Sequence, residues 1–326
     1  MMKTLVHSTG SYLPKTVLRN EELTQFSREA VRLISEKTGV LARRVASEDE
    51  CTSDLAVKAA VRCLEKAGFP PEKVQCIMVS TSSPDRTQPA TATRVQFLLG
   101  AVNSFAFDIN SVCSGSTFGI SLADSMIRSG QCGNVLFIAS EVYSRILNKN
   151  DFSTYPFFGD GAGAVLFQAG DSTPKGVLRS CLMTDGSTHD VICVPGGGTM
   201  LPYEKVESQR SLYFRMKGER VMAFSIERGP EVIRKVAEES GTDLEDIRCI
   251  LCHQANINII RRISEDLGLP FARFFVNLYN YGNTASASVL IALDEAISAG
   301  AVSEGDLIIT VSFGGGLSWG ANLIRI

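Results

Sequence analysis

Short and long apolar patterns alternate along this chain, and this alternation limits the fold classes open to it. Short runs rich in β-branched residues are followed by longer runs whose apolar residues recur every three or four positions. This alternation is typical of an α/β protein. The predicted strands are Cys76–Ser80, Phe105–Ile109, Val135–Ala139, Ala164–Phe167, Ile250–Cys252 and Leu307–Val311. The predicted helices are Ser53–Ala67, Thr117–Ser129, Pro230–Ser240, Ile257–Leu267 and Ala287–Ser298.

The order of these elements also repeats at about half the chain length. In each half a predicted strand is followed by a polar residue before a helix, Cys113 in the first half and Asn283 in the second. These two residues are 170 positions apart. We interpret the repeat as two similar halves, residues 1–170 and 171–326, joined near Ala169–Lys175. The alternative is that any two α/β segments share this rhythm.

The composition excludes several functional classes. Hydrophobic side chains make up 44% of the 326 residues, and the net charge of −3 gives no general attraction to nucleic acid or to an anionic membrane. The nine cysteines are scattered and have no spacing typical of metal ligands. An odd number of cysteines fits reduced thiols, so we expect a cytoplasmic protein with no metal and no cofactor.

Three residues have settings that suit catalysis. Cys113 follows a predicted strand and precedes a helix, whose dipole favours the thiolate and so lowers the thiol pKa. His253 ends a predicted strand, the position at which α/β proteins commonly carry functional groups. Asn283 lies in a run of small residues before a helix. Each has a structural alternative: a buried free cysteine, a histidine held in a turn, and a helix N-cap, respectively.

Two glycine-rich runs complete the set of candidates. Phe313-Gly314-Gly315-Gly316 follows the last predicted strand, and its bare backbone N–H groups suit an oxyanion hole. Residues 158–163 read Phe-Gly-Asp-Gly-Ala-Gly and precede a predicted strand. A dinucleotide-binding loop instead follows a strand and opens a helix, so we exclude nucleotide binding at this run.

Together these motifs resemble β-ketoacyl-acyl-carrier-protein synthase III. The matching motifs occur in the same order over nearly the whole chain: Val-Cys-Ser-Gly at 112–115, Phe-Gly-Asp-Gly-Ala-Gly at 158–163, His-Gln-Ala-Asn at 253–256, Tyr-Gly-Asn-Thr at 281–284 and Phe-Gly-Gly-Gly-Leu-Ser-Trp-Gly at 313–320. The resemblance implies a thiolase fold, in which two duplicated halves form a five-layered α-β-α-β-α core, and a homodimer.

The resemblance also implies a role for each candidate residue. Cys113 would attack an acyl thioester primer and hold the acyl group. His253 and Asn283 would donate hydrogen bonds to a malonyl-type thioester as decarboxylation turns it into an enolate. The backbone N–H groups of Cys113 and Gly315 would form the oxyanion hole. The substrate pocket would be formed by Gln88, Phe158, Met216, Gly218, Met222 and Phe313.

The implied activity is acyl transfer by decarboxylative Claisen condensation, in fatty-acid initiation or in secondary metabolism. Its partners would be acyl thioesters of coenzyme A, of acyl carrier protein or of both, with no nucleic acid and no membrane. The carrier site departs from the family pattern, because Leu33 and Phe152 stand where the family commonly has a tryptophan and an arginine around the adenine. Arg261 and Arg262 are basic residues on the expected docking helix, and Gln88 replaces a pocket-capping phenylalanine.

Other activities are compatible with parts of the pattern. A papain-type cysteine hydrolase also uses Cys, His and Asn in this order, but the local signature of its cysteine is absent. A non-condensing acyl transferase of the same family would act on alcohols or amines, and such relatives often replace the asparagine that is intact here. A non-catalytic subunit is disfavoured by the complete set of three catalytic residues.

Overall fold

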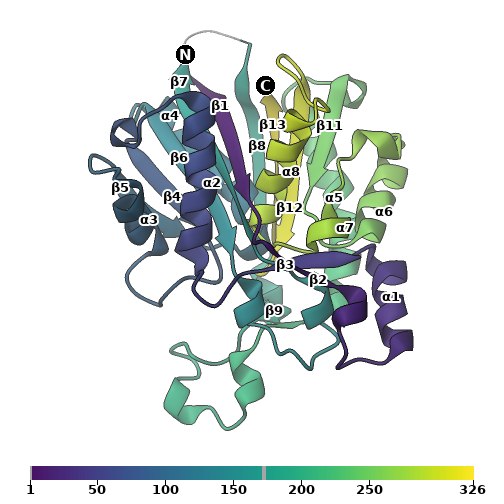
Figure 1. Cartoon of the computed structure of the whole chain (residues 1–326). Coiled ribbons are helices and arrows are strands. Elements are labelled where there is room, and N and C mark those ends of the chain that lie inside the picture. Colours follow the sequence, from purple (N-terminus) through teal and green to yellow (C-terminus); the bar gives the residue numbers. More distant parts are fainter. Residues whose placement is uncertain (1, 171–173) are drawn as a thin grey trace.

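Two β-sheets stand side by side at the centre of the molecule (Figure 1). The computed structural model describes residues 2–170 and 174–326. The first sheet has the strand order β1-β7-β6-β4-β5, with bounds Lys3–Tyr12, Gly161–Gly170, Asn134–Glu141, Cys76–Ser80 and Phe105–Ile109. The second has the order β11-β12-β13-β8, with bounds Ile247–Cys252, Leu307–Gly314, Ser318–Arg325 and Gly176–Thr184.

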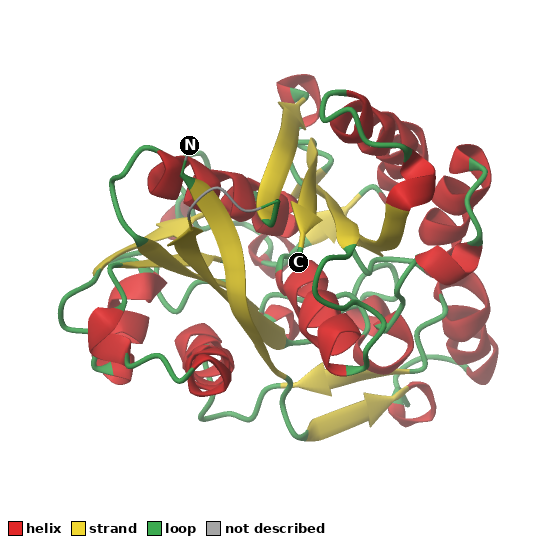
Figure 2. Cartoon of the chain, turned by 90° about the horizontal axis from the view of Figure 1, so that it is seen from above, coloured by secondary structure: helices red, strands yellow, loops and turns green. Residues whose placement is uncertain are grey.

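Helices lie between the sheets and on both of their outer faces. Helices α4 (Gly115–Arg128) and α8 (Ala287–Ser298) lie between the sheets and contact strands of both, which the view from above in Figure 2 makes visible. The outer face of the first sheet is covered by α2 (Thr52–Ala67) and α3 (Thr91–Leu99), and that of the second by α5 (Gly218–Glu238) and α6 (Ile257–Leu267). The predicted five-layered thiolase fold is therefore confirmed.

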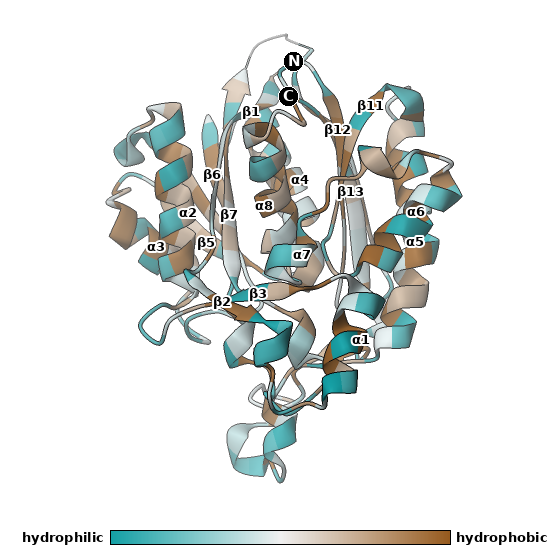
Figure 3. Cartoon of the chain, turned by 45° about the vertical axis from the view of Figure 1, so that its right-hand side comes forward, coloured by the Kyte–Doolittle hydropathy of each residue, from teal (hydrophilic) through white to brown (hydrophobic). Residues whose placement is uncertain are grey.

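The burial of each helix follows from its apolar pattern. The central α8 is apolar on nearly all sides, with nine of its 12 residues buried, because it packs against both sheets. The outer helices are apolar on one face only, and Figure 3 shows their hydrophilic faces turned outward. Among the described residues, no helix has the length and apolar character needed to cross a membrane.

Smaller elements flank the two sheets. Strands β2 and β3 pair with each other, as do β9 and β10, and β2, β3, β9 and α1 lie toward the lower end of the view in Figure 1. Their bounds, with those of α1 and the short α7, are Thr16–Arg19, Ala42–Val45, Ile192–Cys193, Arg215–Met216, Arg28–Thr38 and Leu278–Tyr281.

Most predicted elements coincide with observed ones. The strands of the first sheet all come from residues 3–170 and those of the second from residues 176–325. The junction predicted near Ala169–Lys175 includes residues 171–173, which lie outside the described residues. Four elements have the predicted bounds at both ends: Cys76–Ser80, Phe105–Ile109, Ile257–Leu267 and Ala287–Ser298.

One predicted helix is wrong at its start. The helix expected at Pro230–Ser240 begins three turns earlier, at Gly218, and contains Pro230 in its interior. A Cβ atom on Gly229 would lie 2.7 Å from Ile263 and 3.1 Å from Phe313, so the helix is packed tightly at this point. Tertiary packing therefore overrides the tendency of proline to end a helix.

Strand β7 also begins earlier than the predicted Ala164, because it takes in the last glycines of the 158–163 run. It starts at Gly161 and pairs with β1 and β6. A Cβ atom on Gly163 would lie 2.5 Å from Cβ of Leu290 on α8. Glycine is therefore required here by the close approach of α8 to the strand, not by a ligand.

Candidate active site

The three predicted catalytic residues line one cavity of about 560 Å³ with mainly apolar walls. Cys113 follows β5, His253 follows β11, and Asn283 lies between α7 and α8. All three side chains are buried. Residues separated by up to 170 positions are thus brought together where the two halves meet.

Cys113 occupies a single 3-10 turn, Val112–Ser114, directly before α4. Val112 has a φ of 47°, a left-handed conformation that costs free energy for a β-branched residue. A Cβ atom on Gly115 would lie 2.0 Å from Ser80 Oγ, so any larger residue here would require the Ser80 side chain to move. The turn thereby places the sulfur atom at the N-terminus of α4 and inside the cavity.

The expected lowering of the Cys113 thiol pKa is wrong. Burial raises the pKa of this thiol, and the nearby negative charge of Glu141 raises it further. The backbone N–H of Cys113 and the Tyr143 side chain act in the opposite direction and do not outweigh burial. The thiol is therefore protonated at neutral pH.

His253 is a neutral imidazole in this site. Burial lowers its pKa from 6.5 to about 4. Ser288 Oγ lies 2.7 Å from Nδ1 of His253 and accepts a hydrogen bond from the backbone N–H of Gln254 (3.3 Å). Ser288 therefore occupies Nδ1, and Nε2 is the nitrogen left for the cavity. A Ser288 hydroxyl hydrogen donated to Nδ1 would leave the imidazole proton on Nε2.

Asn283 is held by backbone bonds and keeps its amide N–H₂ for the cavity. Its N–H donates to the carbonyl oxygen of Phe157 (2.8 Å), and its own carbonyl accepts from Gly159 (3.0 Å). The side-chain oxygen accepts from the Ala285 N–H (2.8 Å). Helix α8 has Ser286 as its N-cap, so Asn283 is not the cap of that helix. The side chain is therefore fixed through its oxygen, with the nitrogen as the remaining donor.

The glycine run at 313–316 lies against the turn that carries Cys113. A Cβ atom on Gly314 would lie 2.6 Å from the nitrogen of Ser114 and 2.9 Å from that of Cys113. Gly315 lies next to Val112 and Ile192. The backbone of this run is therefore close enough to the Cys113 turn for both to face the same substrate atom.

Five of the six predicted pocket residues line the cavity, and one does not. Phe158, Met216, Gly218, Met222 and Phe313 line the cavity. Gln88 does not line it in the single chain, because it lies exposed on the loop between β4 and α3.

The four predicted carrier residues also lie outside the cavity lining. Leu33 is half-buried on α1, and Phe152 packs edge to face against Phe26 with the ring centroids 5.2 Å apart. Arg261 and Arg262 are exposed on α6, where Arg261 lies over Phe271 and Arg262 pairs with Glu265.

Sequence reasoning missed a buried carboxylate, Glu141, whose charge acts on the Cys113 thiol. Glu141 ends β6 and is fully buried. It accepts hydrogen bonds from the backbone N–H and hydroxyl groups of Ser82 and Ser83, and from the hydroxyl of Ser286 at 2.7 Å. The one signal in the sequence was an acidic residue at the end of an otherwise apolar strand. The same pattern is equally typical of the start of an exposed loop.

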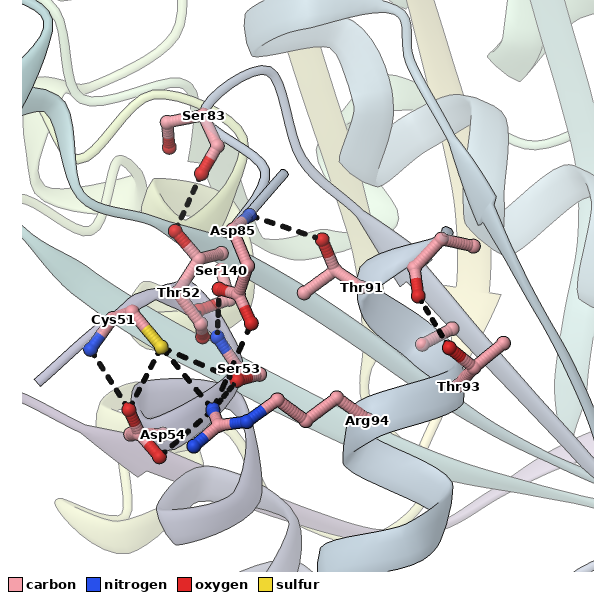
Figure 4. A network of polar contacts seen from close by, with 12 residues as sticks. Cys51, Thr52, Ser53, Asp54, Ser83, Asp85, Thr91, Thr93, Arg94 and Ser140 are labelled. Carbon is pink, nitrogen blue, oxygen red and sulfur yellow. Dashed lines mark hydrogen bonds and ion pairs between the residues drawn. The ribbon is translucent and has the colours of Figure 1, made fainter. Parts of the chain in front are cut away.

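The loop that carries Ser82 and Ser83 is also anchored to neighbouring elements. Figure 4 shows this polar network, which ties the loop to the start of α2 and to α3. Thr52 Oγ1 donates to the carbonyl oxygen of Ser83 (2.5 Å), Ser140 Oγ donates to that of Thr52 (2.7 Å), and Arg94 pairs with Asp54 (3.0 Å). The network therefore holds the serines in position against Glu141.

The layered fold and a shared cavity with cysteine, histidine and asparagine define a condensing enzyme of the thiolase fold. Family profiles described as 3-Oxoacyl-[acyl-carrier-protein (ACP)] synthase III and as its C-terminal part match residues 107–186 and 237–326. The chain belongs to the 3-oxoacyl-[acyl-carrier-protein] synthase III family. Among the described residues, no group of three or more His, Cys, Asp and Glu side chains is placed to hold a metal ion.

Similar proteins cover the chain from end to end. A β-ketoacyl-[acyl-carrier-protein] synthase III of Clostridium acetobutylicum is 38% identical over 317 residues, 97% of each chain. The crystal structure of the 3-oxoacyl-[acyl-carrier-protein] synthase III from Aquifex aeolicus has a TM-score of 0.90 at 37% identity and covers 99% of this chain and 100% of its own. A priming β-ketosynthase from a polyketide biosynthetic pathway has a TM-score of 0.91 at 29% identity, over 99% of this chain and 96% of its own.

Proposed function

We propose that this enzyme joins an acyl thioester primer to a malonyl-type thioester by decarboxylative Claisen condensation, through an acyl-Cys113 intermediate. It is then an acyltransferase of the 3-oxoacyl-[acyl-carrier-protein] synthase III type, acting in fatty-acid initiation. The observation that carries the proposal is the meeting of Cys113, a neutral His253 and the free amide of Asn283 in one apolar cavity.

In the first step Cys113 attacks the carbonyl carbon of the primer thioester. The sulfur–carbon bond forms, and the carrier leaves as its thiol. The backbone N–H groups of Cys113 and Gly315 bind the oxyanion that develops. The acyl chain lies among Phe158, Met222 and Phe313, whose apolar surfaces exclude water from the intermediate.

In the second step the malonyl-type thioester loses carbon dioxide. Nε2–H of His253 and the amide nitrogen of Asn283 donate to its thioester carbonyl oxygen and stabilise the enolate. The enolate carbon attacks the acyl group on Cys113, and the carbon–sulfur bond breaks. A neutral donor suits this step because it binds the developing negative charge without first taking up a proton.

We also propose that residues 1–170 and 171–326 are two copies of one ancestral unit. In support, each half supplies all the strands of one sheet and one of the two central helices. Cys113 and Asn283 each precede the central helix of their half.

A homodimer is the proposed assembly. Strand β5 forms one edge of the first sheet, and no other strand of the described residues pairs with its outer side. Phe97, Val102 and Phe105 are exposed next to this edge. An apolar edge strand is a template for pairing with a second copy. Phe105→Arg should shift the sedimentation coefficient to that of a monomer; a monomeric native protein would contradict the proposal.

The substrates arrive on coenzyme A, on acyl carrier protein, or on one each. The relatives are named for acyl-carrier-protein substrates. The reaction takes place in the cytoplasm, which agrees with nine free cysteines in the described part of the chain.

Intact-protein mass spectrometry tests the proposed function. Incubation with acyl thioesters on each carrier should add one acyl group, which the substitution Cys113→Ala removes. Addition of a malonyl thioester should release a 3-oxoacyl thioester and carbon dioxide. Primer hydrolysis without carbon–carbon bond formation would contradict the proposal.

A further inference from the structure

A hydrogen bond between the two halves ties the loop after Asn283 to Glu141. Ser286, which is three residues after Asn283 and is the N-cap of α8, donates from Oγ to Oε1 of Glu141 at 2.7 Å. The carbonyl oxygen of Ser80 lies 3.4 Å from the same hydroxyl. Glu141 and Ser80 end strands β6 and β4 of the first sheet, whereas Ser286 belongs to the second half. All three residues are buried, so solvent does not compete for this contact.

The turn between Asn283 and Ser286 contains a strained residue. Ala285 has a φ of 47°, in the left-handed region that favours glycine. The φ angle sets the direction of the Ala285 N–H relative to the residues that follow, and in this conformation the N–H donates to the side-chain oxygen of Asn283 at 2.8 Å. Such a conformation persists only where its surroundings hold it. Because Ser286 is the next residue, its bond to Glu141 holds the turn from the C-terminal side, and the backbone bonds of Asn283 hold it from the other.

Ser286 also lies next to the turn that carries Cys113. A Cβ atom on Gly115, the first residue of α4, would lie 3.5 Å from Cβ of Ser286. Gly115 directly follows the 3-10 turn Val112–Ser114. The position of Ser286 therefore affects where Asn283 lies relative to Cys113, and both of these side chains line the same cavity.

The carboxylate of Glu141 is a suitable anchor for this turn. It accepts hydrogen bonds from the backbone N–H groups of Ser82 and Ser83, each at 3.1 Å, and from the Ser83 hydroxyl at 2.6 Å. An ionised carboxylate has about four lone-pair sites and no hydrogen of its own, so it accepts from Ser286 as well. One buried group of the first half thus holds two loops, one from each half.

We propose that Ser286 and Glu141 are positioning residues of the condensation step: their hydrogen bond keeps Ala285 in its left-handed conformation and thereby aims the amide nitrogen of Asn283 into the cavity. The inference rests on the proposed function, in which Asn283 donates to the malonyl-type thioester and takes no part in the acylation of Cys113. Loss of the bond therefore affects the second step alone. A catalytic group displaced by about 1 Å loses up to about 10²-fold in rate.

Ser286→Ala tests the proposal, because it removes the hydroxyl and keeps the Cβ atom beside Gly115. Condensation, measured in a single turnover from the preformed acyl-Cys113 enzyme, should slow by about 10–10²-fold. Acylation of Cys113 by the primer thioester should keep its wild-type rate constant. Ser264→Ala is the matched control and should leave both steps unchanged, since Ser264 is also buried but donates to the carbonyl oxygen of Leu269 at 2.7 Å and does not line the cavity.

Two results of this comparison would overturn the proposal. Equal slowing of acylation and condensation in Ser286→Ala would mean that the variant merely loosens the fold. Wild-type rates in both steps would mean that Glu141, whose charge the variant leaves in place, serves the site without Ser286.

Double variants show whether the hydroxyl acts through Asn283 and Glu141. In the Asn283→Ala enzyme, Ser286→Ala should have little further effect on condensation, because the side chain that it orients is absent. In Glu141→Gln, an N–H₂ group replaces one acceptor oxygen, so condensation should be slow and Ser286→Ala should again add little. A fall equal to the product of the single effects in either background would overturn the proposal.

Crystal structures of wild type and of Ser286→Ala give a readout that does not depend on activity. The side-chain oxygen of Asn283 should bond the Ala285 N–H in wild type and lie beyond about 3.5 Å from that nitrogen in the variant. This change in an enzyme that forms no carbon–carbon bond would overturn the proposed function and support the positioning role. An Asn283 side chain that Ser286→Ala leaves in place would overturn the positioning role, whatever the activity of the enzyme.

Discussion

Ser288 Oγ lies 2.7 Å from Nδ1 of His253, although the two residues are 35 positions apart. Ser288 is the second residue of α8, and His253 directly follows β11. The hydroxyl also accepts the N–H of Gln254, and it is free to donate its own hydrogen to Nδ1. In the proposed mechanism this donation keeps the imidazole proton on Nε2, the nitrogen left for the substrate.

The substitution Ser288→Ala should lower the condensation rate about tenfold, since it releases the tautomer that presents Nε2–H. Self-acylation of Cys113 should be unchanged. Ser225→Ala is the matched control, because Ser225 lines the same cavity but donates to the carbonyl oxygen of Val221. Equal condensation in Ser288→Ala and wild type would show that the hydroxyl does not set the tautomer.

The substitutions His253→Ala and Asn283→Ala should each lower condensation by about 10²–10³-fold, the usual effect of one donor to a developing oxyanion. Acylation of Cys113 should remain, because neither side chain contacts the primer carbonyl in the proposed mechanism. Asn258→Ala is the control, since Asn258 also lines the cavity but donates to the carbonyl oxygen of Lys37. Wild-type condensation in Asn283→Ala would assign that residue a structural role.

Stability should fall on mild acidification because of His253. Its pKa is lowered from 6.5 to about 4 by burial, so between these values the unfolded chain binds a proton that the folded chain does not. The contribution is fully present above about pH 6.5 and is lost as the pH falls toward 4. Between pH 7 and pH 5 the expected loss in the free energy of unfolding is about 2 kcal/mol.

Urea unfolding of wild type and of His253→Gln measures that contribution. The difference between the two proteins should change with pH by about the amount given above. An identical pH dependence in His253→Gln and wild type would contradict a lowered pKa.

Coenzyme A thioesters should bind weakly. Leu33 offers no aromatic face to an adenine, and Phe152 is packed edge to face between Phe26 and Phe157. Stacking of a base on an aromatic side chain contributes about 1–3 kcal/mol in single-stranded nucleic-acid complexes, so its loss corresponds to about tenfold or more in affinity.

The test compares the acylation of Cys113 by the same acyl group carried on coenzyme A and on the carrier protein. The carrier-protein form should acylate Cys113 faster, and Leu33→Trp should improve the use of coenzyme A. Binding of coenzyme A in the low micromolar range, or acylation by the coenzyme A form alone, would contradict this prediction.

Gly314→Ala should abolish acylation. A Cβ atom at this position would lie 2.7 Å from the carbonyl oxygen of Ser111 and 2.9 Å from the nitrogen of Cys113, so the backbone of the nucleophile turn has to move. Gly198→Ala is the control, because a Cβ atom there meets nothing within 4 Å. Mass spectrometry of the acyl-enzyme checks both, and normal acylation of Gly314→Ala would show that the turn tolerates the displacement.

The part of the site that could be predicted consists of residues whose local sequence carries a signal. Cys113 stands at a strand-to-helix junction and His253 at a strand end, and both features are visible in the apolar periodicity. Glu141, Tyr143 and Ser288 carry no such signal. A charged residue at the end of a strand is normally exposed. Glu141 is buried because loop residues about 60 positions away fold over it and supply its hydrogen bonds.

The sequence by itself determined the α/β class, the order of the strands and helices, and the positions of Cys113, His253 and Asn283 within them. These properties depend on residues that are close in the sequence, within one or two helical turns or the length of one strand. Apolar periodicity and residue spacing therefore predict them. Only the tertiary structure decided that the thiol pKa of Cys113 is raised, that the imidazole of His253 is neutral and that Pro230 lies inside a helix. The two pKa values depend on the exclusion of water by segments that are distant in the chain, and the helix through Pro230 depends on close packing by such segments. A local sequence pattern contains no information about contacts with distant segments.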